Sequence, residues 1–149
     1  MAQINPYLNF NGNTEEAFNF YKSVFGGEFA TLMRFKDAPG GDCGGTQIAE
    51  NELDKIMHIA LPIGDGNVLM ATDALESMGQ KLEDGNNFSL SISAHSKDEA
   101  DKLFNGLAEG GAVEMPLADA FWGAYFGMLK DKFGIRWMVN YDQRYATQQ

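Results

Sequence analysis

This 149-residue sequence contains one cysteine, no long apolar run and few positively charged residues. Cys43 is the only cysteine, so one chain can form neither an internal disulfide nor a cysteine-based metal site. Cys43 lies in a glycine-rich stretch without a nearby histidine, which disfavours a catalytic thiolate. The longest apolar runs are a few residues, whereas a membrane span needs about 20. The sequence therefore predicts no membrane-spanning helix.

Acidic residues outnumber basic residues, 21 against 11, which gives a formal charge of −10. Such a chain repels polyanions and has no Lys/Arg cluster, so nucleic acid is not an expected partner. The first residues contain neither a basic stretch nor an apolar core, so we expect no secretory signal. Hydrophobic residues make up 44% and are spread along the chain. These features predict a soluble, globular, cytoplasmic protein.

Two segments repeat the same helical pattern. Each helix is expected to begin at a capping residue, Asn13 or Ser96, with a glutamate three residues later. The apolar residues that follow have the spacing of a helix packed on a sheet. They agree at an offset of 83, as Ala17, Phe20, Tyr21, Val24 and Phe25 in the first helix and Ala100, Leu103, Phe104, Leu107 and Ala108 in the second. This agreement predicts an internal duplication.

The strand patterns after each helix repeat as well. Gly66 aligns with Gly134 and Met70 with Met138, at an offset of 68 residues. This offset is smaller than the 83 residues of the helices, because the first copy carries a long glycine-rich connection over 37–55. Glycine supplies the backbone conformation of a tight hairpin turn. The predicted order is strand, helix and three strands, at 4–10, 13–25, 28–36, 56–63 and 67–73, and again at 88–94, 96–109, 112–118, 124–130 and 135–141.

The predicted architecture is an α+β fold of two βαβββ modules with mixed sheets, because each helix joins its flanking strands by a crossover. A sheet with one helix has a bare face, which the other module or a second chain would cover. We expect a single domain over 1–149, with module one at about 1–75, module two at about 86–142 and a flexible tail at 143–149.

Several segments spread over nearly the whole chain resemble one superfamily. They are residues 5–10, Phe20 with Tyr21, 25–28, 56–58 and, above all, Phe121-Trp122-Gly123, 125–127 and Asp131-Lys132-Phe133-Gly134-Ile135-Arg136-Trp137. With them the chain resembles the vicinal oxygen chelate superfamily of glyoxalase, bleomycin-resistance and extradiol dioxygenase proteins. Within it the chain resembles the PhnB-like branch, often labelled 3-demethylubiquinone 3-methyltransferase-like. The resemblance implies curved sheets around a central cavity, and a homodimer.

The resemblance also implies a divalent metal held by His or Glu at four inward strand positions, two from each module. The matching positions here are Pro6 or Tyr7, Met70, Ser89 and Met138. None has the carboxylate or imidazole donor that such a cation needs. We therefore expect no metal and no other cofactor, and an apolar cavity instead.

Two histidines and two arginines are the candidates for acid/base or anion-binding roles. His58, in an apolar strand pattern, is either a catalytic acid/base or a hydrogen-bonded structural histidine. His95, beside the capping Ser96, is assigned a surface or capping role. Arg34 and Arg136 either bind a substrate carboxylate or phosphate, or pair with nearby acids.

Aromatic residues and methionines supply the candidate ligand contacts. Each either packs in the core or lines an adaptable apolar cavity. The predicted ligand-binding residues are Tyr7, Met70, Ser89, Trp122, Tyr125 and Met138.

Three functions stay open at this point. The first is a metal-free protein that binds a small apolar or aromatic ligand in a cavity between the sheets. The second is an enzyme, an isomerase, lyase or transferase with or without an atypical metal site, that uses His58 as acid/base. The third is a ligand-free dimeric scaffold. Methyl transfer is not expected, because Gly64-Asp65-Gly66 has a hairpin pattern and Gly40-Gly41 and Gly44-Gly45 lead to no helix.

Overall fold

The computed structural model describes residues 2–37, 42–43, 46–64 and 66–146. The chain divides into two compact units, Met1–Glu83 and Asp84–Gln149. Unit one contains β1 (Tyr7–Phe10), α1 (Thr14–Phe25), β2 (Thr31–Arg34), β5 (Ile56–Ile63) and β6 (Asn67–Asp73). Unit two contains β7 (Leu90–Ser93), α2 (Lys97–Ala108), β8 (Ala112–Asp119), β9 (Tyr125–Lys130) and β10 (Arg136–Tyr141). The shorter elements are η1 (Phe35–Asp37), β3 (Asp42–Cys43), β4 (Thr46–Gln47), η3 (Glu50–Glu52), η4 (Glu76–Met78) and α3 (Gln143–Ala146).

The two units share one sheet topology. Sheet one has the strand order β1-β6-β5-β2 and sheet two has the order β7-β10-β9-β8. The first strand of each unit runs parallel to the last, and the other pairs are antiparallel. Both sheets are open and mixed. The predicted α+β fold of two βαβββ modules is therefore confirmed.

Four other expectations have different outcomes. The single domain over 1–149 and the cavity between the sheets stay predictions. Part of the tail expected to be flexible, at 143–149, forms α3, and residues 147–149 lie outside the described part of the chain. Within the described ranges, no helix has the length and apolar character of a membrane span.

The start of α1 corrects a predicted cap. The Asn13 side chain makes no capping hydrogen bond. Instead Asp73, at the end of β6, accepts hydrogen bonds from Thr14 N at 3.0 Å and Thr14 Oγ1 at 2.6 Å. Its other oxygen accepts from Ile56 N at 2.8 Å, and its side chain is buried. A carboxylate distant in sequence therefore replaces the local cap and ties α1 to β5 and β6.

The start of α2 confirms the second predicted cap. Ser96 Oγ accepts a hydrogen bond from Glu99 N at 3.0 Å, and Glu99 Oε1 accepts one from His95 N, also at 3.0 Å. The two contacts resemble a capping box, except that the Glu99 side chain accepts from the backbone N–H of His95 and not from that of Ser96. His95 is exposed, in agreement with a surface and capping position.

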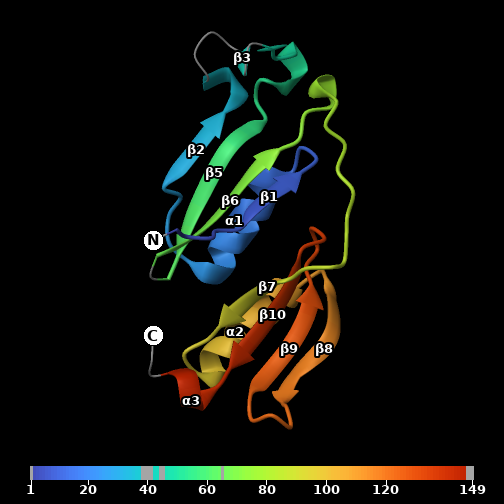
Figure 1. The fold of residues 1–149 in the computed structure, drawn as a ribbon. Helices are drawn as coiled ribbons and strands as arrows, with labels where there is room; N and C mark the ends of the chain where they lie inside the picture. Colours follow the sequence, from blue (N-terminus) through green and yellow to red (C-terminus); the bar gives the residue numbers. More distant parts are fainter. Residues whose placement is uncertain (1, 38–41, 44–45, 65, 147–149) are drawn as a thin grey trace. The chain divides into compact units, whose positions relative to one another are not determined.

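The core of each unit lies between its helix and one face of its sheet (Figure 1). Helix α2 buries four of the five predicted residues, namely Ala100, Leu103, Phe104 and Leu107. Helix α1 buries Thr14, Ala17, Phe18 and Tyr21, whereas Phe20, Val24 and Phe25 are half-buried. Phe18 was not predicted. It is buried because its ring contacts Phe10 and Tyr21 edge-on, with centroids 6.4 and 5.5 Å away.

Each sheet has a second face, turned away from its helix, which we call its open face. Side chains alternate along a strand, and directly opposed residues of paired strands share a face. Leu8, Leu69 and Ile59 face α1 and are buried, so the residues between them belong to the open face. The open face of sheet one comprises Tyr7, Asn9, Thr31, Met33, His58, Ala60, Pro62, Val68, Met70 and Thr72.

Candidate functional site

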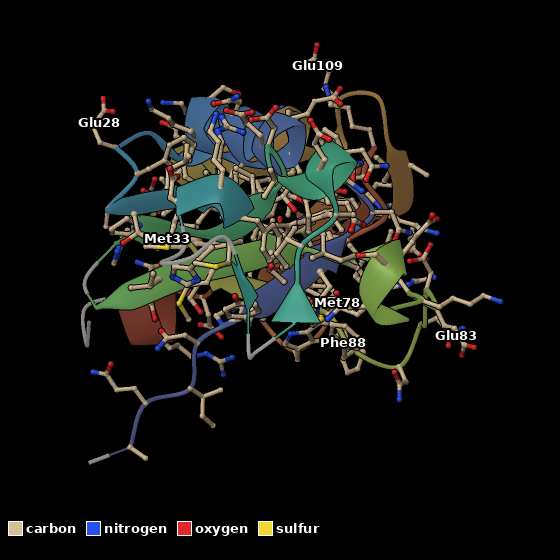
Figure 2. The ribbon with its side chains drawn as sticks, turned by 90° about the horizontal axis from the view of Figure 1, so that it is seen from above. Glu28, Met33, Met78, Glu83, Phe88 and Glu109 are labelled. Carbon is tan, nitrogen blue, oxygen red and sulfur yellow. The ribbon has the colours of Figure 1, made fainter. Side chains whose placement is uncertain are left out.

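The open face of sheet one brings together three of the predicted site residues, Tyr7, His58 and Met70. Tyr7 of β1 lies opposite Met70 of β6, and Met70 lies opposite Ala60 of β5, two residues beyond His58. At the sheet edge, Met33 of β2 lies opposite His58; its side chain is labelled in Figure 2. Three adjacent strands and their register therefore form this cluster.

Tyr7 and His58 are in direct contact. The Tyr7 hydroxyl lies 3.3 Å from His58 Nδ1, and the two rings are stacked with centroids 5.7 Å apart and planes inclined by 28°. If Nδ1 of the neutral imidazole accepts the phenol proton, Nε2 carries the ring hydrogen and can donate to a further group. The contact holds the imidazole in a defined orientation, which suits either ligand binding or proton transfer.

The Tyr7 phenol is a hydrogen-bond donor at neutral pH. Burial raises the pKa of Tyr7 above its ordinary value, and a hydrogen bond with Thr72 acts in the opposite direction. The net direction is upward, so the hydroxyl keeps its proton well above pH 7. Thr72, with Asn9 opposite it, adds further neutral polar groups to the same face. No sequence pattern singled out Thr72, Asn9 or Met33. Thr72 and Asn9 alternate with buried residues, and Met33 lies opposite His58.

The open face of sheet two carries a row of methionines. Met138 of β10 lies opposite Met128 of β9, and Met128 lies opposite Met115 of β8. Ser91 of β7 completes the row on the other side of Met138. Trp122 lies at one end of this face, where its ring packs edge-on against Phe126 at a centroid distance of 5.7 Å.

Tyr125 is not brought together with Met138. Its hydroxyl donates a 2.6 Å hydrogen bond to Asp101 Oδ1 of α2, and Lys97 Nζ lies 5.0 Å from its ring centroid. The hydrogen bond to Asp101 raises the pKa of Tyr125. These contacts place Tyr125 on the helix-covered side of sheet two, opposite the methionine row. Ser89 precedes β7 and lies outside the sheet. Ligand-binding roles for Ser89, Trp122, Tyr125 and Met138 stay predictions.

The positions equivalent to the superfamily's metal ligands do not fit a divalent cation. Met70 pairs with Tyr7, and its counterpart Met138 pairs with Ser91, so Ser91 takes the place assigned to Ser89. The first strands of the two units therefore align at an offset that is one residue larger than the offset of the two helices. Phenol, thioether and hydroxyl groups are poor donors for a hard or borderline ion. In the part of the chain that the structure describes, no three His, Cys, Asp or Glu residues group as metal ligands.

The two strand arginines pair with acids. Arg34 donates to Glu15 Oε2 at 2.7 Å and to the Asp54 carbonyl oxygen at 2.8 Å. Arg136 Nη1 contacts both carboxylate oxygens of Glu114 at 2.7 Å. Of the two alternatives for these arginines, the structure shows the acid pairing.

The most specific segment of the resemblance, residues 131–137, organises a hairpin. Asp131 is buried and accepts hydrogen bonds from Phe133 N at 2.8 Å and Ile135 N at 3.0 Å. Its second oxygen accepts from Trp137 Nε1 at 2.8 Å. Gly134 completes the turn with a φ of 92°. This segment therefore maintains the β9–β10 connection.

Comparison with known proteins places the chain in a family. The profile of the family described as 3-demethylubiquinone-9 3-methyltransferase matches residues 2–140. Protein YjdN of Escherichia coli is 30% identical, over 97% of this chain and 99% of that protein. The crystal structure of PA1353 from Pseudomonas aeruginosa is 44% identical, with a TM-score of 0.82 over 95% of this chain and 98% of that chain.

A more distant likeness extends to the superfamily fold. A glyoxalase/bleomycin resistance protein/dioxygenase family enzyme from Burkholderia phytofirmans shares 20% identity and a TM-score of 0.58, over 91% of this chain and 95% of that chain. At this identity the likeness shows the fold alone. With the profile match, the near-complete overlap with YjdN and the two βαβββ modules, the chain belongs to the 3-demethylubiquinone-9 3-methyltransferase family and has the fold of the glyoxalase/bleomycin resistance/dioxygenase proteins.

Proposed function

We propose that this chain is a cytoplasmic, metal-free protein that binds a small apolar or aromatic ligand on the open face of sheet one. The observation that carries the proposal is the stacked Tyr7–His58 pair beside Met70. The two rings offer flat apolar surface, and the Met70 thioether adapts to an apolar ligand. The hydroxyl and imidazole groups provide the few polar contacts that orient a ligand in a mostly apolar site.

Methyl transfer, which the family's description names, is not part of the proposal. Gly64 and Gly66 lie between β5 and β6, with φ values of 61° and 84°, and belong to a hairpin. They do not connect a strand to a helix, as the glycines of a nucleotide-binding loop do. The donors at the superfamily's metal positions likewise give no support to metal-dependent chemistry at those positions.

We expect His58→Ala and Tyr7→Phe to weaken ligand binding by about threefold to tenfold, because each removes one oriented hydrogen bond. The measurement is a thermal-shift screen of the intact protein against aromatic acids, quinones and hydrophobic antibiotics, followed by calorimetric titration of the strongest hit. His95→Ala is the matched control, because this exposed histidine lies in the other unit. It should bind like the unmodified protein.

The outcomes separate the candidate functions. Unchanged ligand affinity in both variants would mean that the ligand does not bind on the open face of sheet one. A protein that binds nothing in the screen fits the scaffold better. The enzyme alternative rests on the 3.3 Å contact that orients the imidazole. It gains support if a bound compound is converted by the unmodified protein and no longer converted by His58→Ala.

We also expect a homodimer. Both sheets are open, so β1 and β2 in sheet one and β7 and β8 in sheet two are the edge strands of their sheets. Closed pairs are the commonest way to cover such surfaces. Light scattering at micromolar concentration should give twice the chain mass of 16.4 kDa. A single-chain mass over this range would contradict the dimer.

A further inference from the structure

The open face of sheet one lacks formal charge. Within the described strands β1, β2, β5 and β6, the residues assigned to this face include no Lys, Arg, Asp or Glu. Sheet two differs, because Lys130 and Arg136 lie opposite each other two residues from its methionine row. The neutral character is therefore a property of the face that carries Tyr7 and His58.

Three cations of unit one, Arg34, Lys36 and Lys55, pair with acids. Arg34 follows Met33 in β2 but turns to Glu15 of α1, on the helix side. Lys36 Nζ lies 2.9 Å from Asp54 Oδ1. Lys55 Nζ lies 3.9 Å from Glu52 Oε2. A ligand carboxylate on the open face would have to displace one of these acids to gain a cationic partner.

An anionic ligand would therefore be bound at a disadvantage. Its charge would lose water and receive in return only one neutral donor from the Tyr7–His58 pair, the imidazole Nε2–H when the Tyr7 hydroxyl donates to Nδ1. Removing an ionised group from water without a paired charge is costly. The chain's net charge of −10 adds a repulsive background. A neutral carbonyl or hydroxyl oxygen has a much smaller desolvation cost and accepts the same hydrogen bond.

We infer that the ligand of this face is an uncharged aromatic or apolar molecule with a carbonyl or hydroxyl oxygen, such as an aryl ketone, a quinone or a neutral phenol, and not a carboxylate or phosphate. The inference rests on the proposed function and narrows it to a chemical class. The Tyr7–His58 pair binds the oxygen, while Met70 and Met33 contact the apolar part.

Acetophenone and benzoate are the probes. Both contain a phenyl ring and a carbonyl group. Acetophenone carries a methyl group at the position where benzoate carries an ionised oxygen. Calorimetric or NMR titration of the intact protein is carried out at about pH 8, where an ordinary imidazole is neutral. We expect acetophenone to bind at least about tenfold more tightly than benzoate, a difference of about 1.4 kcal/mol. Tyr7→Phe should weaken acetophenone binding by about threefold to tenfold. The control His95→Ala, at an exposed histidine of the other unit, should leave it unchanged.

Two results would overturn the inference. Benzoate binding as tightly as acetophenone would show that the face accepts an anion, and would leave the proposed binding function in place. Failure of both probes to bind at millimolar concentration would show that the face has no affinity for such rings. The proposed function itself falls only if the wider screen also yields no ligand sensitive to His58→Ala or Tyr7→Phe.

Discussion

Replacing Asp73 with alanine is expected to lower the free energy of unfolding of unit one by about 4 kcal/mol. The buried carboxylate accepts three hydrogen bonds, two from Thr14 and one from Ile56 N. Its loss leaves buried donors without this acceptor and removes a negative charge from the start of α1, where the helix dipole favours one. The substitution therefore weakens the attachment of α1 to the β5–β6 hairpin and to sheet one.

Chemical denaturation followed by far-UV circular dichroism measures the effect, and amide hydrogen exchange in β5 and β6 locates it. Tryptophan fluorescence is unsuitable, because Trp122 and Trp137 both lie in unit two. Asp73→Asn, which keeps one acceptor oxygen, should lose less stability. Asp119→Ala is the matched control. It removes an exposed carboxylate paired with Lys97 and should cost below about 1 kcal/mol. An Asp73→Ala protein as stable as this control would contradict the role assigned to Asp73.

The second large effect is expected for Asp131→Ala, at about 3 kcal/mol in unit two. The substitution removes the acceptor for two backbone N–H groups of the β9–β10 turn and for the indole N–H of Trp137. Because Trp137 is buried, its fluorescence during denaturation reports the change directly.

A double-mutant cycle separates the turn from the indole contact. Trp137→Phe removes the indole donor but keeps a large ring, so Asp131→Ala should cost less in that background, by about 1–2 kcal/mol. Because this background lacks Trp137, all four proteins are compared by chemical denaturation followed by far-UV circular dichroism. Identical costs in both backgrounds would mean that the Asp131–Trp137 hydrogen bond contributes nothing. The control is again Asp119→Ala, whose exposed ion pair lies in the same unit.

The elements of the fold were predictable because their signals are local. Helical spacing, the Ser96 cap and the glycine turns are read within about ten residues, and they predicted both modules. The Asn13 cap was wrong for the same reason. The acceptor at the start of α1 comes from Asp73, fifty-nine residues away in sequence, and no local pattern encodes that contact.

The candidate site was predictable only in part. Tyr7, His58 and Met70 were named from the sequence, but their shared face depends on the register of three strands, which composition does not specify. A shift by one residue transfers a side chain to the opposite face. Tyr125 illustrates the difficulty, because it was grouped with Met138 and lies on the other side of the same sheet. Ser89 was two residues from Ser91, the residue that pairs with Met138.

The pairing of each module's first strand with its last has a kinetic consequence. In unit one, β1 cannot join its sheet until β6 exists, and Asn5 and Val68, which are hydrogen-bonded, are 63 residues apart. Contacts between distant residues slow folding, because the chain ends must meet before those contacts form. The connection between β8 and β9 is short, whereas residues 37–55 lengthen the corresponding loop of unit one. During synthesis the N-terminal unit therefore begins folding earlier but has the longer loop to close.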